Sequence, residues 1–292
     1  MNFNKWLLKN TKSLEGKYIA ISGSTGGIGK SLCRYLAQLG AVLVLLNRND
    51  IKAKRQEEEL KSEITSAKIF RISVDMENLD SVKTAVEELK KLPLYAVIHN
   101  AGAYSIPRRK CSTGFDNVFQ INFVSPYYIT KELLPTLRKN GGRVIAVGSI
   151  AHNYSQTDKK DIDFSTRKAA SKAYGNAKRF LMFSLYGLFE NEEDAFLSVT
   201  HPGITFTNIT AHYPKLIFAL IKHPMKVIFM SPKTACLSIL KGIFETTEDS
   251  TWIGPGVFNV WGRPKKQTLK TCDRSEKEFI FSTAEKIYTH LL

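Results

Sequence analysis

Cysteine is scarce in this sequence, and its cysteines lie far apart. Only four occur in 292 residues, and no two of them form a CxxC pair. Zinc ribbons need CxxC pairs, and disulfide-stapled scaffolds are short chains dense in cysteine. The sequence therefore excludes these two classes and predicts no metal site. The same scarcity is typical of a protein from a reducing compartment, and we expect a cytoplasmic protein.

Long hydrophobic runs are absent as well. The most apolar stretch, residues 216–230, is interrupted by two lysines, a histidine and a proline, and it is shorter than the ~20 residues that span a bilayer. Only three apolar residues separate Lys5 from Lys9, too few for the core of a secretory signal. We expect neither a spanning helix nor such a signal. Phe3, Trp6 and Leu7 fit one face of a short helix, either an interfacial membrane anchor or an ordinary surface helix.

Acidic residues are outnumbered by basic ones. Asp and Glu total 27 against 42 Lys and Arg, so the formal charge is +15. A surplus of this size favours a polyanionic partner, such as a membrane surface, a phosphate-bearing cofactor or an acidic acyl carrier, although a merely soluble basic surface fits equally well. The sequence contains no helix-turn-helix, zinc-finger or aromatic RNA-binding signature. We therefore expect no nucleic-acid partner.

Apolar segments of strand length alternate with segments of helical period. The strand candidates are residues 18–21, 41–46, 68–74, 94–99, 143–147 and 195–200. The helix candidates are residues 29–39, 50–66, 78–91, 115–138, 167–190 and 232–246. This alternation is typical of a parallel sheet covered on both faces. We predict a single doubly wound α/β domain over residues 14–262, with basic extensions at 1–13 and at 263–292, the second of them helical.

A glycine-rich turn follows the first predicted strand and opens a helix. Gly23 permits a tight turn, Gly27 lets the backbone approach a pyrophosphate, and Gly29 lets the helix pack closely. The turn also contains Ser24, Thr25 and Ile28. The helix N-terminus adds amide donors and a partial positive charge. The turn therefore predicts a dinucleotide site.

The end of the turn also resembles the end of a triphosphate P-loop, with Gly29, Lys30 and Ser31 in sequence. That motif requires glycine where Ser24 stands, and Gly23 comes one residue too early. A loop of this spacing has the wrong length to cradle a triphosphate. We therefore favour the dinucleotide interpretation.

Asn47 and Arg48 stand where a site for NAD would place an acidic side chain. A carboxylate there would repel a 2′-phosphate, whereas a guanidinium pairs with one in a bidentate manner. The sequence predicts NADP(H) in preference to NAD(H). The alternative is that Arg48 is an ordinary solvated residue at a strand end.

Four further positions suggest acid–base chemistry. Tyr174 and Lys178 are four residues apart in a predicted helix, so they share a face. An ammonium group stabilises the phenolate of a nearby tyrosine, whose reference pKa is about 10. Ser149 ends the fifth predicted strand, where open α/β sheets bind ligands, and Asn122 lies in the preceding helix.

In this order, the motifs resemble the short-chain dehydrogenase/reductase family over residues 14–260. The resemblance rests on the glycine turn, Asn122, Ser149 and the Tyr174 and Lys178 pair. Two short motifs complete it, one formed by Asn100, Ala101 and Gly102 and the other by Pro202 and Gly203. It implies a Rossmann fold, with Tyr174 as proton donor and acceptor. It also implies that Lys178 lowers the pKa of Tyr174 and holds the nicotinamide ribose, that Ser149 hydrogen-bonds the substrate oxygen, and that Asn122 supports a proton relay.

The resemblance extends to the cofactor's two ends and to the substrate. Pro202, Gly203, Thr205 and Thr207 would grip the nicotinamide carboxamide, and Asp75 would lie at the adenine. In this family the region that corresponds to residues 205–231 forms a substrate lid. Here it is strongly apolar, which favours a retinoid, steroid or fatty-acyl substrate and also fits a membrane contact. The alternative is a helix buried in a dimer or against the sheet. The resemblance also makes a homodimer or homotetramer an expectation.

The sequence departs from the family pattern in three places. Ser22 replaces a common threonine and Ala177 a common serine, and neither change removes a catalytic group. The step of 25 residues from Ser149 to Tyr174 is longer than usual and resembles the retinol-dehydrogenase-like and related branches. Tyr154 is an alternative acid or base, but the residue four positions on is an aspartate, which cannot supply a cation.

These motifs predict hydride transfer between a nicotinamide and a carbonyl or secondary alcohol, with Tyr174 handling the proton. Two other classes remain as alternatives. One is an NADP-binding regulator without turnover, which would have no need of Asn122, Ser149, Tyr174 and Lys178. The other is a nucleic-acid-binding protein, which only the net charge suggests.

Overall fold

The computed structural model describes residues 3–205, 230–269 and 272–292, and its strands form one eight-stranded sheet in the order β3-β2-β1-β4-β5-β6-β7-β8. The strands are β1 (Tyr18–Ser22), β2 (Val42–Asn47), β3 (Lys68–Ser73), β4 (Leu94–His99), β5 (Arg143–Val147), β6 (Phe196–Thr200), β7 (Thr251–Val257) and β8 (Trp261–Thr268). Strands β1 to β7 are parallel, and β8 pairs antiparallel with β7. The strand order reverses between β1 and β4, and such a switch point opens a crevice at the carboxyl ends of the strands.

The doubly wound α/β fold predicted from the sequence is confirmed. The six predicted strands agree with β1 to β6 within one residue at each end. Strands β7 and β8 were not predicted, because Gly254, Pro255 and Gly256 interrupt the apolar pattern of β7 and because β8 is mostly exposed. Proline and lysine on an edge strand protect the sheet from pairing with other chains, and β8 carries Pro264 and Lys265.

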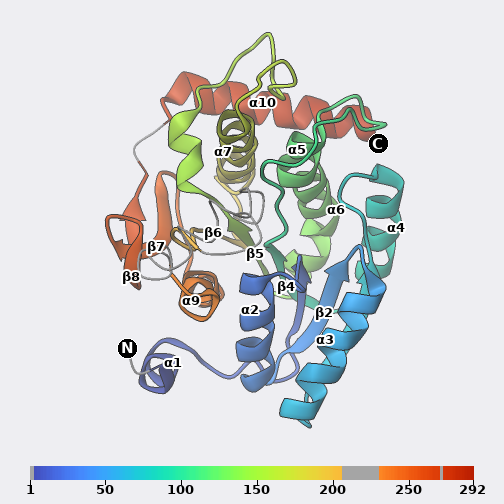
Figure 1. Ribbon diagram of the computed structural model, residues 1–292, viewed down its shortest axis with the longest axis vertical. Helices are drawn as coiled ribbons and strands as arrows, with labels where there is room; N and C mark the ends of the chain where they lie inside the picture. Colours follow the sequence, from blue (N-terminus) through green and yellow to red (C-terminus); the bar gives the residue numbers. More distant parts are fainter. Residues whose placement is uncertain (1–2, 206–229, 270–271) are drawn as a thin grey trace, which may run out of the picture.

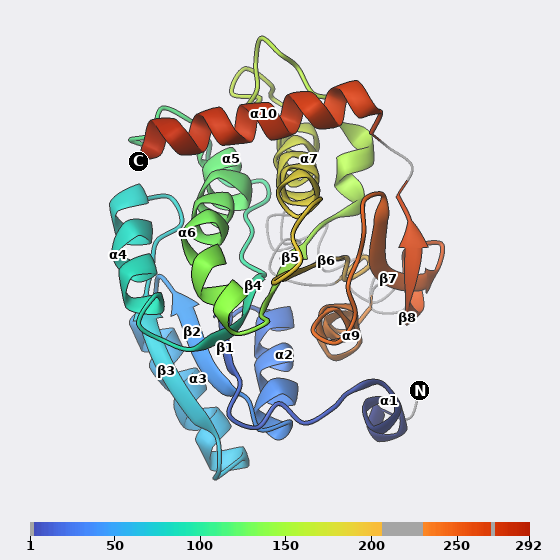
Figure 2. The same cartoon turned by 180° about the vertical axis from the view of Figure 1, so that it is seen from behind.

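Helices cover both faces of the sheet (Figures 1 and 2). One face holds α2 (Gly27–Gln38), α3 (Asp50–Glu63) and α9 (Pro232–Gly242). The other holds α4 (Leu79–Leu89), α6 (Ser125–Lys139) and α7 (Ala170–Leu188). Two separate clusters of buried apolar side chains lie under these layers, because each strand presents alternate residues to opposite faces.

One predicted helix, residues 115–138, is interrupted in the structure. A short segment α5 (Asn117–Phe119) leads into the π-helix η1 (Gln120–Val124), and α6 follows. The amide of Ser125 donates to the carbonyl oxygen of Gln120, five residues back. π-helical turns are rare in proteins, and those that do occur are often found at functional sites.

The two ends of the chain pack on the domain. In α1 (Phe3–Asn10), Trp6 is buried in the apolar cluster beneath α2 and α9, which favours a surface helix over a membrane anchor based on Trp6. At the other end, α10 (Arg274–Leu291) lies against α7 (Figure 2) and buries Ile280, Ala284, Ile287 and Leu291 in the other cluster. Across the described residues, none of the helices combines the length and the apolar character needed to cross a membrane.

Candidate active site

The glycine turn joins β1 to α2 at the carboxyl edge of the sheet. Gly23 has a φ of +66°, and a Cβ atom there would lie 2.9 Å from the Cα of Ala101. A Cβ on Gly29 would lie 2.4 Å from the carbonyl oxygen of Gly23. Both positions therefore require glycine, and the turn presents backbone at the N-terminus of α2.

Side-chain hydrogen bonds tie the ends of β1 and β4 together. The hydroxyl of Ser22 accepts from the backbone amides of Asn100, at 3.1 Å, and Ala101, at 3.0 Å. The Asn100 side chain donates to the carbonyl oxygens of Ser22 and Gly23, both at 3.1 Å. Ser22 thus supplies the hydroxyl that the more common threonine would supply, and this network holds the glycine turn beside Gly102.

A cavity of about 490 Å³ opens at this edge of the sheet. It is lined by the glycine turn, the ends of β2, β3 and β4, and residues that follow them; the sequence-predicted residues in its wall are Gly23, Thr25, Gly27, Ile28, Gly29, Asn47, Arg48, Asp75, Asn100, Ala101 and Gly102. Ser24 is fully buried behind the turn and accepts a hydrogen bond from Asn47 at 2.8 Å. The structure therefore brings the residues predicted for the pyrophosphate and adenosine ends of a dinucleotide into one wall.

Arg48 stands at the rim of this cavity. Its side chain is 66% exposed, and its Nη1 lies 3.8 Å from Asp75 Oδ1 and 3.6 Å from Glu77 Oε1. Glu77 also pairs with Arg109. Lys52, in the first turn of α3, lines the same wall. This part of the wall therefore holds two cations, Arg48 and Lys52, and two carboxylates, those of Asp75 and Glu77. A phosphate bound there would compete with the carboxylates for the Arg48 guanidinium.

Three of the predicted catalytic side chains come together at the carboxyl end of β5. Tyr174 lies close enough to Ser149 for the serine hydroxyl to lower the pKa of the phenol. Lys178, only 2% exposed, donates to the carbonyl oxygen of Val147 at 2.8 Å, and its Nζ lies 5.7 Å from the centre of the Tyr174 ring. Tyr104 packs against the same ring in a T-shaped arrangement, with centroids 5.4 Å apart. This arrangement holds a phenol, a hydroxyl and an ammonium group around one point.

Burial shifts the pKa values of both ionisable partners. It raises the pKa of Tyr174 to about 12, and the hydrogen bond from Ser149 opposes this rise. It lowers the pKa of Lys178 to about 8, because the ammonium group is removed from water. At neutral pH the phenol therefore carries its proton, and Lys178 is close to its titration range.

Asn122 connects the π-helix to this centre. Its side-chain amide donates to the carbonyl oxygens of Ala103, at 2.9 Å, and Val118, at 2.8 Å, and its Oδ1 accepts from the amide of Ala103 at 3.3 Å. A Cβ on Gly102 would lie 2.9 Å from Asn122 Oδ1 and 3.6 Å from Lys178 Nζ. Asn122 and Lys178 therefore both lie against Gly102, where a side chain would crowd Asn122.

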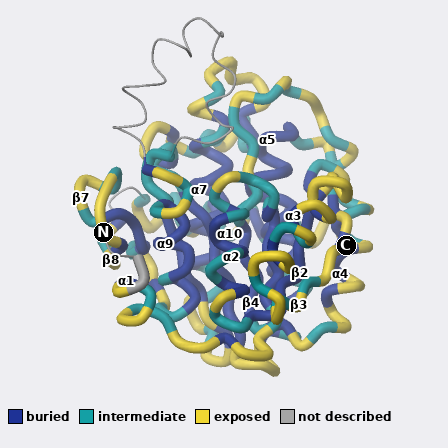
Figure 3. The backbone as a smooth tube through the Cα atoms, turned by 60° about the horizontal axis from the view of Figure 1, so that its bottom comes forward, coloured by how far each residue is buried: buried dark blue, intermediate teal, exposed yellow. Residues whose placement is uncertain are grey.

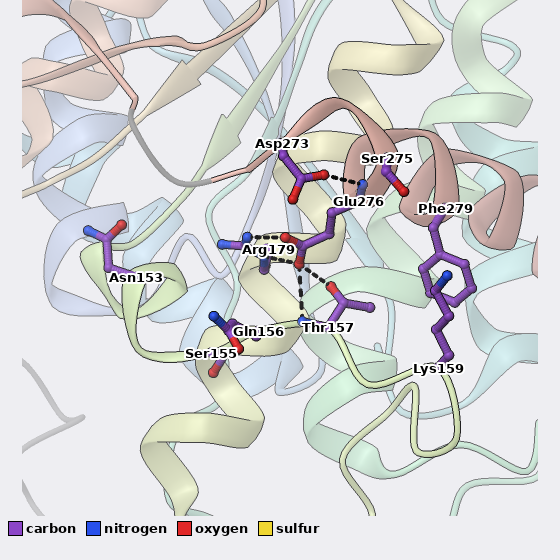
Figure 4. A pocket seen from close by; sticks show the side chains of 10 residues that line it. All are labelled: Asn153, Ser155, Gln156, Thr157, Lys159, Arg179, Asp273, Ser275, Glu276 and Phe279. Carbon is purple, nitrogen blue, oxygen red and sulfur yellow. Dashed lines mark hydrogen bonds and ion pairs between the residues drawn. The ribbon is translucent and has the colours of Figure 1, made fainter.

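The segment between Ser149 and Tyr174 begins with the 3-10 helix η2 (Ile150–Tyr154), which Ser149 caps by accepting from the amide of Ala151. Tyr154 points outward with 62% of its surface exposed, so it is not beside Ser149 as Tyr174 is. Beyond η2, the segment forms one wall of a larger cavity of about 610 Å³, shown in Figure 4. There Arg179 pairs with Glu276 of α10. None of the residues predicted for the catalytic centre or the cofactor lines that cavity.

The segment after β6 is described only in part. Gly203 has a φ of +79°, and a Cβ there would lie 2.7 Å from the carbonyl oxygen of Val260. Thr205 forms an isolated parallel bridge with Met230. Pro202 precedes this turn. Thr207 and residues 206–229 of the predicted lid lie outside the described residues.

Sequence reasoning missed several residues of the site. Lys52, Glu77 and Tyr104 left no signal because their roles depend on the fold that gathers them. A stronger signal was available for His152, three residues after Ser149: its Nδ1 donates to the Ser149 carbonyl oxygen at 2.5 Å. His152 is fully buried against Trp252, with ring centroids 5.3 Å apart.

Comparisons with known proteins add to this geometry. A family model described as short chain dehydrogenase matches residues 17–177, more than half of the chain. Human polyprenol dehydrogenase is 30% identical over 203 residues, which cover 66% of this chain and 62% of that protein. Mouse retinol dehydrogenase 12 is 26% identical over 202 residues, which cover 68% of this chain and 64% of that protein. The matches thus span less than two thirds of the length of these two relatives.

Solved structures share the fold. A protein from Mycobacterium paratuberculosis aligns over 96% of both chains, with a TM-score of 0.73 and 20% identity. The active-site complex of RhlG and NADP from Pseudomonas aeruginosa has a TM-score of 0.60 and 22% identity, over 80% of this chain and 91% of that chain. At this level of identity the likeness concerns the fold alone.

Proposed function

Because the chain belongs to the short-chain dehydrogenase family, we propose that this oxidoreductase uses NADP(H) to interconvert a lipophilic carbonyl and its alcohol, with Tyr174 as the acid and base. The observation that carries the proposal is the contact of Tyr174 with Ser149 beside a buried Lys178. Burying an ammonium group is costly, and such a cost is typical of functional sites. A regulator without turnover would need Lys178 at most for the cofactor, and would not need Tyr174 and Ser149 beside it.

The bound cofactor supplies or accepts the hydride. Ser149 donates a hydrogen bond to the carbonyl oxygen and orients it. Tyr174 then donates its proton to the same oxygen, and the raised pKa means that this proton is present at neutral pH. In the reverse direction Tyr174 must first lose its proton, which the ammonium group of Lys178 favours.

The groups at the glycine turn fit a dinucleotide. Gly23 and Gly29 leave no room for a side chain, so backbone amides at the N-terminus of α2 would hold a pyrophosphate. Arg48 and Lys52 line the wall where an adenosine 2′-phosphate would lie, and Asp75 stands next to them for the adenine. Lys178 would hold the nicotinamide ribose, while Pro202, Gly203, Thr205 and Thr207 would hold the carboxamide.

The substrate class rests on two supports. Residues 205–231 are strongly apolar in sequence, and an apolar wall binds apolar substrates. Two relatives are named for polyprenol and retinol, both long apolar alcohols. We propose a substrate of the same chemical class, an extended apolar chain that ends in an alcohol or carbonyl group.

A carbonyl panel tests the proposal. NADPH absorbance is followed with aldehydes and ketones of increasing apolar length, and the rate per enzyme is expected to rise with that length. NADH at the same concentration is expected to give a lower rate. Consumption of NADPH that no carbonyl accelerates would overturn the proposed reaction, and equal rates with short polar and long apolar carbonyls would overturn the substrate class.

A further inference from the structure

The hairpin between β7 and β8 ends in an exposed aromatic tip. The amide of Val260 donates to the carbonyl oxygen of Val257 at 3.0 Å, which closes a four-residue turn. Its central residues, Phe258 and Asn259, have φ values of +50° and +58°. Phe258 is 86% exposed, Val257 is 47% exposed and Trp261 is 40% exposed. Three neighbouring apolar side chains thus face solvent at one point of the surface.

The conformation of Phe258 makes this tip unusual. Turns with positive φ at both central positions favour Asn and Gly, which adopt the left-handed region at low cost. A bulky aromatic residue in that region is an outlier. Phe258 gains almost no burial that would offset this cost. Within the domain, Phe258 therefore has two unfavourable features, a positive φ and an exposed apolar side chain. A contact with a partner outside the domain would explain both.

The charge around the tip selects the kind of contact. Residues 251–268 contain Arg263, Lys265 and Lys266 and neither Asp nor Glu. Lys266 pairs with Glu248 at 3.2 Å, outside the hairpin. On the same side of the molecule, α1 exposes Leu8, at 86%, next to Lys9 (Figures 1 and 3). Aromatic and apolar side chains with flanking cations are the combination that docks proteins on anionic lipid surfaces.

The hairpin is also attached to the segment that follows β6. His201 Nε2 donates to the carbonyl oxygen of Asn259 at 2.8 Å, and the ring of His201 stacks on Trp252 of β7 with centroids 4.7 Å apart. The carbonyl oxygen of Val260 lies where a side chain on Gly203 would point. The hairpin tip and the segment 201–205 therefore form one packed unit.

We propose that the tip formed by Val257, Phe258 and Trp261 inserts into the interface of an anionic bilayer, with Arg263 and Lys265 against the lipid headgroups. Docking in this way would place the segment 201–205, and the active site beside it, at the membrane surface where apolar alcohols and carbonyls accumulate. That benefit rests on the proposed function, whereas the docking itself needs no turnover.

Vesicle binding of the full chain tests the docking. The substitution Phe258→Asn removes the aromatic side chain and installs a residue that suits the positive φ, so the melting temperature is expected to stay the same or rise. Binding to vesicles of phosphatidylcholine with phosphatidylglycerol is expected to weaken by about tenfold or more, since a phenyl group leaves the interface. Ile51→Gln, which changes an equally exposed apolar residue on α3, is the matched control and is expected to bind like the wild type.

The charge component is tested with Arg263→Gln combined with Lys265→Gln. Binding to anionic vesicles is expected to fall by about fivefold for each charge, and added salt is expected to abolish the difference. The proposal is overturned if the wild type does not bind the anionic vesicles, if Phe258→Asn binds as well as the wild type, or if Phe258→Asn converts a dimer into a monomer in sedimentation, which would assign the tip to a second copy of the chain. Loss of vesicle binding with unchanged turnover of a soluble carbonyl separates docking from catalysis.

Discussion

At the scale of single residues, the site depends on side chains whose charge is controlled by burial. Lys178 lies beside Tyr174 and Gly102, and removal from water lowers its pKa to about 8. The same burial raises the pKa of Tyr174 to about 12. The phenol thus carries its proton at neutral pH, as a proton donor to a carbonyl oxygen must. Oxidation of the alcohol is expected to accelerate as the pH rises toward the tyrosine pKa.

Arg48 carries the prediction for cofactor choice. Arg48→Ala is expected to weaken NADPH binding by about 10-fold to 100-fold, because hydrogen bonds to charged groups contribute about 1.5–3 kcal/mol. NADH lacks the 2′-phosphate, so its affinity is expected to stay nearly constant. Fluorescence titration of both cofactors measures this, with Arg55→Ala, an exposed arginine on α3, as the control. An equal loss for NADPH and NADH would show that Arg48 does not discriminate between them.

At the scale of elements, the π-helix η1 shows how a single side chain reshapes a helix. The side chain of Asn122 donates a hydrogen bond to the carbonyl oxygen of Val118, four residues back. Beyond that point the backbone hydrogen bonds change to a spacing of five residues, as from Ser125 to Gln120. The widened turn carries Asn122 to the loop that contains Gly102 and Ala103. The element therefore links the end of β4 to Lys178.

Removing this link is expected to destabilise the fold. Asn122→Ala leaves buried polar groups of Ala103 and Val118 unsatisfied, so the free energy of unfolding is expected to fall by about 1–3 kcal/mol. Asn140→Ala is the matched control, because Asn140 also donates to a carbonyl four residues back, at Thr136, but on the exposed surface. Urea denaturation of both variants measures the difference. Equal stability of the two variants would contradict the role given to η1.

Sequence patterns predicted those parts of the fold that depend on local order. Strands β1 to β6 were predicted because buried parallel strands are continuously apolar. The glycine turn was predicted because positions 23 and 29 have no room for a side chain, so the sequence must carry glycine there. The break at Asn122 was not predicted, since a π-helical turn has no distinct period in sequence. Glu77 and Tyr104 were missed for another reason: which wall they line depends on how the loops after β3 and β4 pack, which the local sequence does not show.

At the scale of the whole molecule, buried histidines link stability to pH. Burial lowers the pKa of His99 to about 3 and the pKa values of His152 and His201 to about 4. Unfolding exposes these rings, which then bind protons below their ordinary pKa of about 6.5. The unfolded state therefore gains protons that the folded state does not, and stability falls as the pH drops below that value.

This linkage has a measurable size. Between pH 7 and pH 5, the free energy of unfolding is expected to fall by about 5 kcal/mol, the sum for three such histidines. Glu276, paired with Arg179, has its pKa lowered to about 2, so its contribution is lost only at still lower pH. Urea titrations at the two pH values test this. An unchanged midpoint would mean that the three rings are already protonated, or accessible to water, in the folded protein.

The central claim is that Tyr174 transfers the proton during hydride transfer, and one comparison tests it most directly. The rate of NADPH consumption with the best carbonyl is measured for the wild type, Tyr174→Phe and the exposed control Tyr154→Phe, with NADPH affinity measured in parallel. The account predicts that Tyr174→Phe loses about 10²-fold to 10⁴-fold in rate while binding NADPH normally, and that Tyr154→Phe is unaffected. A Tyr174→Phe variant that keeps the full rate would contradict it.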